Sequence, residues 1–215
     1  YSTVLLFRER LEENDMLEFI WEGFVHQLKA KGYDVKKGVI QDATFITSDP
    51  GHAKSDVPRG GEAKTRRSKD GAWAKKGNKS HFGYKGHIKT DVENNFIWKV
   101  ETTAANVHDS QVDLANEGEV RYGDKGYHGA KTKGYDASMK RAARGHTLSV
   151  FDDLRNKRIS SKRSLVERCF SVIKIVFKSG HVMVTTVERA AVKMTFNAIG
   201  YNLFNLLGIV NRKAA

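Results

Sequence analysis

The stretch GVIQDATFI, residues 38–46, predicts a β-strand with apolar side chains on both of its faces. Val39 and Phe45 alternate onto one side of this strand, and Ile40 and Ile46 onto the other. A strand that is buried on both faces has to lie inside a sheet that other elements cover. We therefore expect a central sheet with further elements packed on it.

Asp42 interrupts one apolar face of this predicted strand, together with Thr44. A carboxylate in a buried run costs free energy unless it is paired, hydrogen-bonded or bound to a cation. Asp42 is therefore either a hydrogen-bonding group within the fold or a ligand.

Helical periodicity marks three further segments. The first spans residues 14–32 and the second spans residues 161–179. The third spans residues 186–207, where Thr185 and Glu188 have the spacing of a capping box. This last helix is long and apolar, so it is either buried in the monomer or used in oligomerisation.

Strand patterns lie between these helices. Residues 81–92 and 95–103 predict a β-hairpin, and residues 119–124 predict a short strand that ends at Asp124. Residues 129–156 have no clear pattern. Strands and helices in this order predict an α/β domain.

The charge of the chain indicates its partners. Its 37 Lys and Arg residues exceed its 25 Asp and Glu residues, which gives a net charge of +12. Such a chain favours polyanions, among which nucleic acid is a commoner partner than an acidic membrane surface. The alternative is a charge that only keeps the protein soluble.

Other features exclude several classes of protein. The single cysteine, Cys169, rules out an intrachain disulfide framework and a cysteine-based zinc site. No apolar run is long enough to predict a membrane span. The chain begins at Tyr1 without a charged and then apolar leader, which indicates a fragment rather than a secreted precursor.

Residues 48–80 predict a long polar loop after the first strand. Residues 52–90 hold 11 Lys and Arg residues but 3 Asp and Glu residues. A loop of this length in a compact domain is usually functional or disordered. It is either a DNA-contacting insertion or a solvated loop. On the following hairpin, Lys85, His87 and Lys89 share one face, which we expect to meet phosphate or water.

Three acidic residues stand out by their context, namely Asp42, Asp124 and Glu167. Alone, each has an ordinary explanation, because a strand Asp often serves as a cap and a helix Glu as half of a surface ion pair. Two adjacent strands and a packed helix can also bring three carboxylates together. Their mutual repulsion would then require cations, and oxygen ligands suit Mg²⁺ or Mn²⁺. Two ions about 3.5–4 Å apart would support in-line attack on a phosphodiester by water or a 3′-hydroxyl.

Five blocks of the sequence resemble, in order, those of insertion-sequence DDE transposases of the insertion-sequence-five kind. The blocks are QDATFI, DGAWAKKGNKSHFGYKGH, TAANVHDSQ, YGDKGYHG and RSLVERCFSVIK. The resemblance covers residues 1–207 and implies an RNase H-like fold, with a mixed sheet flanked by helices and a basic loop insertion after its first strand. It implies a helical N-terminal segment over residues 1–37, the end of a truncated N-terminal region, and a catalytic domain over residues 38–215.

The resemblance also assigns site residues. Asp42, Asp124 and Glu167 match the catalytic, metal-binding acids, for which it implies two Mg²⁺ or Mn²⁺ ions. Arg163 and Lys174 match the family pattern R-x3-E-x6-K, and helical geometry places both on the same helix face as Glu167.

These two cations are expected to contact DNA phosphates. Lys85 and Lys125 are further candidates for this role, although turn formation would also explain Lys125. Asp109 is expected to cap a short helix, and His108 is not expected to be catalytic.

The implied function is metal-dependent cleavage and strand transfer on double-stranded DNA, at the terminal inverted repeats of an element and at a target. The resemblance also implies a homo-oligomer on DNA and a place in the prokaryotic cytoplasm near the nucleoid. Two alternatives are an RNase H-like nuclease without strand transfer and an inactive remnant that only binds DNA.

Overall fold

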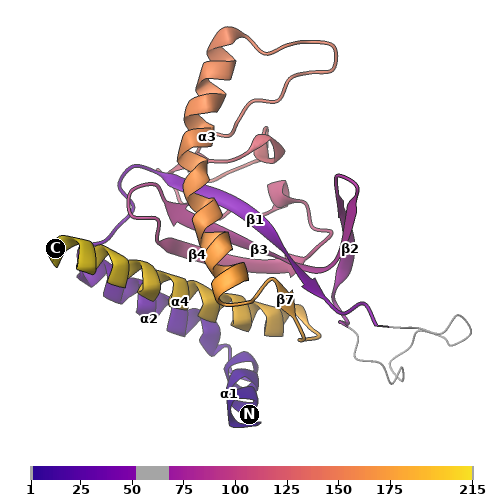
Figure 1. Cartoon of the computed structure of the whole chain (residues 1–215), viewed down its shortest axis with the longest axis vertical. Helices are drawn as coiled ribbons and strands as arrows, with labels where there is room; N and C mark the ends of the chain where they lie inside the picture. Colours follow the sequence, from indigo (N-terminus) through magenta and orange to yellow (C-terminus); the bar gives the residue numbers. More distant parts are fainter. Residues whose placement is uncertain (1, 52–67, 215) are drawn as a thin grey trace, which may run out of the picture.

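The computed structural model describes residues 2–51 and 68–214 (Figure 1). Its elements, in chain order, are α1 (Ser2–Glu13), α2 (Met16–Ala30), β1 (Val39–Ser48), β2 (Ala72–Lys76), β3 (Lys79–Asp91), β4 (Ile97–Ala104), the 3₁₀ helix η1 (Asp109–Gln111), β5 (Val120–Tyr122), the 3₁₀ helix η2 (Lys125–Tyr127), β6 (Tyr135–Asp136), α3 (Val150–Ser171), the π-helical turn η3 (Val172–Val176), β7 (His181–Val182) and α4 (Val187–Ala214).

The strands form one seven-stranded mixed sheet. Its main order is β2-β3-β1-β5-β6, while β4 also pairs with β3 and β7 with β1. The pairs β1–β3 and β3–β4 are antiparallel, whereas β1–β5 and β5–β6 are parallel. A mixed sheet flanked by helices confirms the predicted α/β class and is consistent with an RNase H-like fold.

Helices α3 and α4 cover one face of this sheet, and α3 extends well beyond it (Figure 1). The core on this side joins Ile40 and Ile88 from the sheet to Ile173 and Tyr201 from the helical segments. The prediction that β1 is buried on both faces is confirmed, because Val39 and Ile40 on opposite faces are both fully buried. β1 therefore lies at the centre of the sheet, and the strands on both of its sides pair with it.

The opposite face of the sheet carries a buried layer of charged and polar side chains. Lys85 donates to Asp109 Oδ1 at 2.7 Å and to the Val107 carbonyl oxygen at 2.8 Å. Lys89 donates to Glu119 at 3.0 Å, and His87 is fully buried beside them. The expectation that this hairpin face meets water or phosphate was wrong, because the chain after β4 folds over it and supplies its counter-ions.

Burial of His87 predicts a loss of stability in mild acid. Loss of hydration disfavours the charged imidazole and lowers the pKa of His87 from 6.5 to about 4, while the charge of Asp109 opposes this shift. Between these two values the unfolded chain binds more protons than the folded chain. The free energy of unfolding therefore falls as the pH drops through this window, by about 3 kcal/mol from His87 alone.

The variant His87→Gln is expected to flatten this dependence, because a neutral amide can still reach the Thr103 hydroxyl that now lies 2.9 Å from His87 Nε2. Urea unfolding between pH 4 and pH 7 measures the slope. His146→Gln, at an exposed position, serves as the control and should leave the slope unchanged. An equally steep slope in both variants would exclude His87 as its source.

The N-terminal helices pack on α4. Leu28 of α2 joins Phe96, Trp98 and Ile209 in a second apolar cluster. The helix expected over residues 14–32 is α2, whereas α1 was not predicted from periodicity, although it lies within the helical segment over residues 1–37 that the resemblance implies. The division between residues 1–37 and a catalytic domain from residue 38 remains a prediction.

Part of the predicted loop over residues 48–80 is regular structure. β2 pairs with the start of β3, and the two strands are joined by Gly77 and Asn78. Gly-Asn between two strands is a recognised hairpin turn, so the sequence did contain a signal for this element. Residues 52–67, which make up about half of the predicted basic insertion, lie outside the described residues.

Two helix starts also differ from the prediction. α3 begins at Val150, where Ser149 accepts a hydrogen bond from the Asp152 amide, rather than near residue 161. In α4 the hydroxyl of Thr186 accepts from the Arg189 amide at 3.3 Å. The predicted capping box at Thr185 was therefore one residue too early. In the described part of the chain, no helix is long and apolar enough to span a membrane.

Candidate active site

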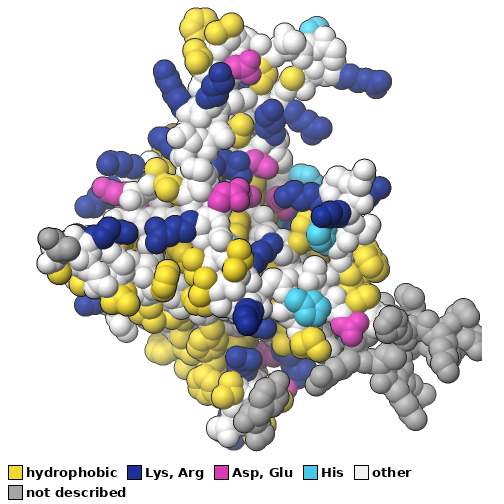
Figure 2. Space-filling view, viewed as in Figure 1, with side chains coloured by type: hydrophobic (Ala, Val, Ile, Leu, Met, Phe, Trp, Pro, Cys, Tyr) yellow, Lys and Arg dark blue, Asp and Glu magenta, His cyan; other side chains and the backbone are white. Residues whose placement is uncertain are grey.

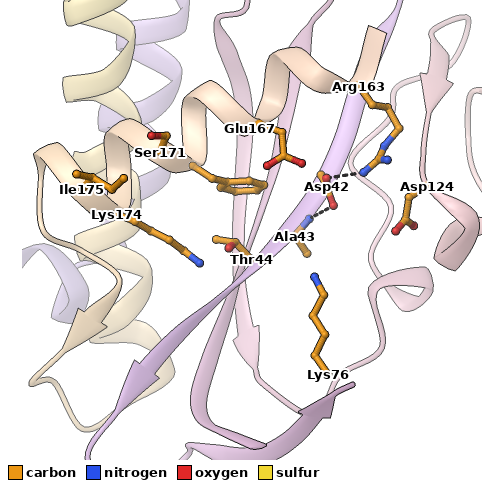
Figure 3. Close-up of a pocket in the computed structure, with 11 residues that line it drawn as sticks. Asp42, Ala43, Thr44, Lys76, Asp124, Arg163, Glu167, Ser171, Lys174 and Ile175 are labelled. Carbon is orange, nitrogen blue, oxygen red and sulfur yellow. Dashed lines mark hydrogen bonds and ion pairs between the residues drawn. The ribbon is translucent and has the colours of Figure 1, made fainter. Parts of the chain in front are cut away.

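The three predicted acids line one open pocket of about 490 Å³ (Figure 3). Asp42 lies in the middle of β1, Asp124 follows β5 after one intervening residue, and Glu167 lies on α3. Arg163 and Lys174, the two predicted phosphate contacts on the helix, line the same pocket. The structure thus brings together five of the seven residues that the sequence singled out.

The parallel pairing of β1 and β5 explains why two of the acids meet. Ile40 is opposite Tyr122 in this pairing. Asp42 lies two residues beyond Ile40, and Asp124 lies two residues beyond Tyr122. Because parallel strands advance in the same direction, both carboxylates reach the same level at one edge of the pairing.

Asp42 is paired with Arg163. Arg163 Nη2 donates to Asp42 Oδ2 at 2.6 Å, and the Ala43 amide donates to Asp42 Oδ1 at 2.8 Å. Burial raises the pKa of Asp42 above its ordinary value, which Arg163 opposes and the nearby charge of Asp124 reinforces. The partly buried carboxylate that interrupts β1 is therefore compensated by a guanidinium from α3.

Asp124 caps the turn that follows β5. Its Oδ1 accepts a hydrogen bond from the Gly126 amide at 2.7 Å. A Cβ atom on Gly126 would lie 2.9 Å from that same oxygen, so glycine permits this close approach. Tyr127 of the same turn is fully buried under it, and the Arg121 guanidinium lies 5.4 Å from the centre of the Tyr127 ring. The buried Tyr127 thus holds the turn against the core, while Asp124 lines the pocket.

One face of the helix carries three further charged groups of the pocket. Arg163, Glu167 and Lys174 line it together with Ser171, and the helical angles predicted that these three charged residues share a face. The first three lie on α3, and Lys174 lies in the π-helical turn η3 that continues it. In Figure 3 the Arg163 guanidinium lies between Asp42 and Asp124, with Glu167 on the other side of Asp42. π-helical turns often occur at functional sites.

The other two predicted phosphate contacts do not line the pocket. Lys85 lies on the opposite face of the sheet, where it is paired with Asp109. Lys125 is exposed on η2, next to Asp124. Asp109 was expected to cap η1, but His108 Nδ1 accepts from the Ser110 amide instead, because the carboxylate of Asp109 is engaged by Lys85.

The donor chemistry of the pocket fits hard divalent cations. Its three acids offer only carboxylate oxygens, which are the preferred ligands of Mg²⁺ and Mn²⁺. Among residues 2–51 and 68–214, no three acidic, histidine or cysteine side chains are close enough to form a finished cation site. Arg163 occupies Asp42 Oδ2, so binding of a cation by all three acids requires side-chain rearrangement.

Sequence reasoning missed several residues of this pocket. Lys76 enters it from β2, and Thr44 and Phe170 complete its wall. Lys76 was assigned to a loop, so its position beside β1 could not be inferred. The Gly77-Asn78 hairpin signal would have placed it on a strand.

Residues 34–203 match a family described as the transposase DDE domain. The chain is also 26% identical over 229 residues to the transposase for insertion sequence element IS1106 of Neisseria meningitidis serogroup B, a match that covers 97% of this chain and 78% of that protein. No solved structure matches significantly. Since the family match spans most of its length, the chain belongs to the insertion-sequence transposases with a DDE domain.

Proposed function

We propose that this transposase cleaves double-stranded DNA at the terminal inverted repeats of its element and joins the ends to target DNA, with Asp42, Asp124 and Glu167 as its catalytic acids. One observation supports this assignment more than any other. Three acids from distant segments line one pocket with Arg163 and Lys174. The rest of that pocket offers no other set of groups that could act on a phosphodiester.

Transposases with this domain generally use divalent metal ions. We propose that Asp42, Asp124 and Glu167 would hold two Mg²⁺ or Mn²⁺ ions. When bound to these acids, such ions would supply activation of a water or 3′-hydroxyl nucleophile and neutralisation of charge on the phosphate. The chain's own contribution is to position the DNA strand, and Arg163 and Lys174 supply positive charge for its phosphates.

The charge of the surface supports DNA as the partner. Figure 2 shows Lys and Arg side chains distributed over the face that carries α3, with fewer acidic side chains among them. Phosphate contacts by such side chains provide salt-dependent affinity for any DNA sequence. Lys125 is exposed next to Asp124 in the chain and is a further candidate for a phosphate contact.

We further propose that several copies act together on paired element ends. α4 has an exposed apolar face that one copy leaves uncovered, formed by Leu203, Phe204, Leu207 and Val210. Light scattering with and without element-end DNA would measure the number of chains. A single chain in both samples would contradict this proposal.

A duplex that carries the element's terminal repeat tests the proposed function. In Mg²⁺ the chain should both hydrolyse the strand at the repeat and, when offered a target duplex, join the 3′-hydroxyl to it. EDTA should abolish both products. Hydrolysis without joined product would identify a nuclease, and salt-dependent binding without either product would identify an inactive remnant.

A further inference from the structure

Two lysines, Lys76 and Lys174, line the same pocket although both are positively charged. Lys76 comes from the end of β2, and Lys174 comes from η3. In Figure 3 the Lys174 side chain extends toward Thr44, and the Lys76 side chain extends toward Ala43. The hydroxyl-bearing residues Thr44 and Ser171 line the same pocket. The pocket therefore combines its three acids with two lysines that come from β2 and η3.

Neither lysine forms an ion pair within the described part of the chain. Lys85 and Lys89, the buried lysines of the opposite face, each have a carboxylate partner. Burial lowers the pKa of Lys174, and the charge of Lys76 lowers it further. Like charges held together in this way cost free energy, which an anion between them would offset.

The fold positions the two lysines differently. The Lys174 stem packs over Gly180, where a Cβ atom would lie 3.5 Å from Lys174 Cγ. Lys76 is the last residue of β2 and pairs with Lys79 across the turn at Gly77, whose φ is +59°, while its side chain is exposed. The backbone of Lys76 is thus fixed at the pocket, and its long side chain can move toward an anion beside Lys174.

We propose that Lys76 and Lys174 together bind one phosphate of the DNA strand that passes through the catalytic pocket, and that Lys76 is thus a substrate-positioning residue. This inference rests on the proposed function. Arg163 lies beside Asp42 and Asp124, Lys76 extends toward Ala43, and Lys174 extends toward Thr44. Cations on different sides of the carboxylates fix the strand across them, so that one phosphodiester faces the acids.

The variant Lys76→Gln tests the proposal through DNA binding in EDTA, where no metal-dependent cleavage occurs. A duplex that carries the element's terminal repeat is the probe. Loss of one charged phosphate contact is expected to weaken binding about tenfold and to reduce the salt dependence of log K by about one unit. Lys75→Gln, one residue earlier on the same strand but outside the pocket, should change affinity much less.

Neutral methylphosphonate groups, introduced one at a time, identify the phosphate. With the wild-type chain, a methylphosphonate at one position of the cleaved strand should weaken DNA binding. With Lys76→Gln, a methylphosphonate at that position should cause no further loss of affinity, whereas methylphosphonates at other contacted positions should still weaken binding. Lys174→Gln should remove the same effect. The same behaviour on the uncleaved strand would instead assign the site to that strand.

The proposal is overturned if Lys76→Gln and Lys75→Gln bind the DNA with the same affinity. It is also overturned if the loss of affinity caused by Lys76→Gln does not depend on which phosphate is replaced by a methylphosphonate. These results are independent of catalysis. If the wild-type chain binds as expected but forms no metal-dependent product, the proposed function fails while the phosphate site stands. If products form normally but Lys76→Gln changes nothing, only the phosphate site fails.

Discussion

The variant Asp124→Asn is expected to lose metal-dependent DNA cleavage by about 10³-fold or more, while its fold is retained. An amide removes one of the three negative charges that the pocket offers to cations. Several kcal/mol of transition-state stabilisation depend on such ligands, and each 1.36 kcal/mol corresponds to about a tenfold change in rate. Cleavage of element-end DNA in Mg²⁺, followed by single-turnover kinetics, gives the rate.

The isosteric change separates chemistry from folding. Asparagine Oδ1 can still accept the hydrogen bond from the Gly126 amide that now measures 2.7 Å, so the turn after β5 is kept. The melting temperature should therefore stay near that of the wild-type chain. Asp153→Asn, at an exposed position on α3 outside the pocket, is the matched control and should cleave normally. Unchanged cleavage by Asp124→Asn would refute the assignment of this acid.

The variant Arg121→Met is expected to destabilise the protein by about 3–5 kcal/mol, the usual cost of removing one partner from a buried ion pair. Arg121 is fully buried, and its guanidinium lies 3.5 Å from Asp113 Oδ1 and donates to Asp136 Oδ1 at 3.1 Å. Its loss leaves two carboxylates without their common cation. It also removes the group that packs on Tyr127 beneath the turn of Asp124.

Urea unfolding at neutral pH measures this loss, and Arg141→Met, at an exposed position, is the control. Methionine retains most of the apolar volume, so the expected difference reports the charge rather than a cavity. Arg121→Met should also cleave DNA more slowly than the wild-type chain under conditions in which it is still folded. A loss below about 1 kcal/mol, the range of surface pairs, would mean that water replaces the guanidinium at little cost.

The central strand could be predicted because local sequence determines it, whereas the grouping of the three acids was expected from the resemblance. Residues 38–46 are apolar on alternating sides, so the strand and the anomaly at Asp42 are visible without a structure. Glu167, Arg163 and Lys174 share a helix face through simple angular spacing. The pocket that they line with Asp124 agrees with the expectation drawn from the five sequence blocks.

Other features could not be predicted because they depend on partners far away in the sequence. Lys85 and Lys89 alternate with apolar residues just as an exposed strand face does, but Asp109 and Glu119 cover them from a segment 24 and 30 residues later. The ion pair of Asp42 with Arg163 joins residues 121 positions apart. Periodicity determines which side a residue faces, but it does not show what lies on that side.

The connection between Asp42 and Asp124 depends on very little backbone pairing. β5 pairs with β1 through two residue pairs, Val39 with Arg121 and Ile40 with Tyr122, whereas β1 and β3 share nine. Short elements with few pairs open locally at a lower free energy than the sheet as a whole. The amides of β5 should therefore exchange with deuterium well before those of β1 and β3. The two acids can then separate while most of the protein stays folded. As the denaturant concentration rises, DNA cleavage should therefore be lost before the protein as a whole unfolds.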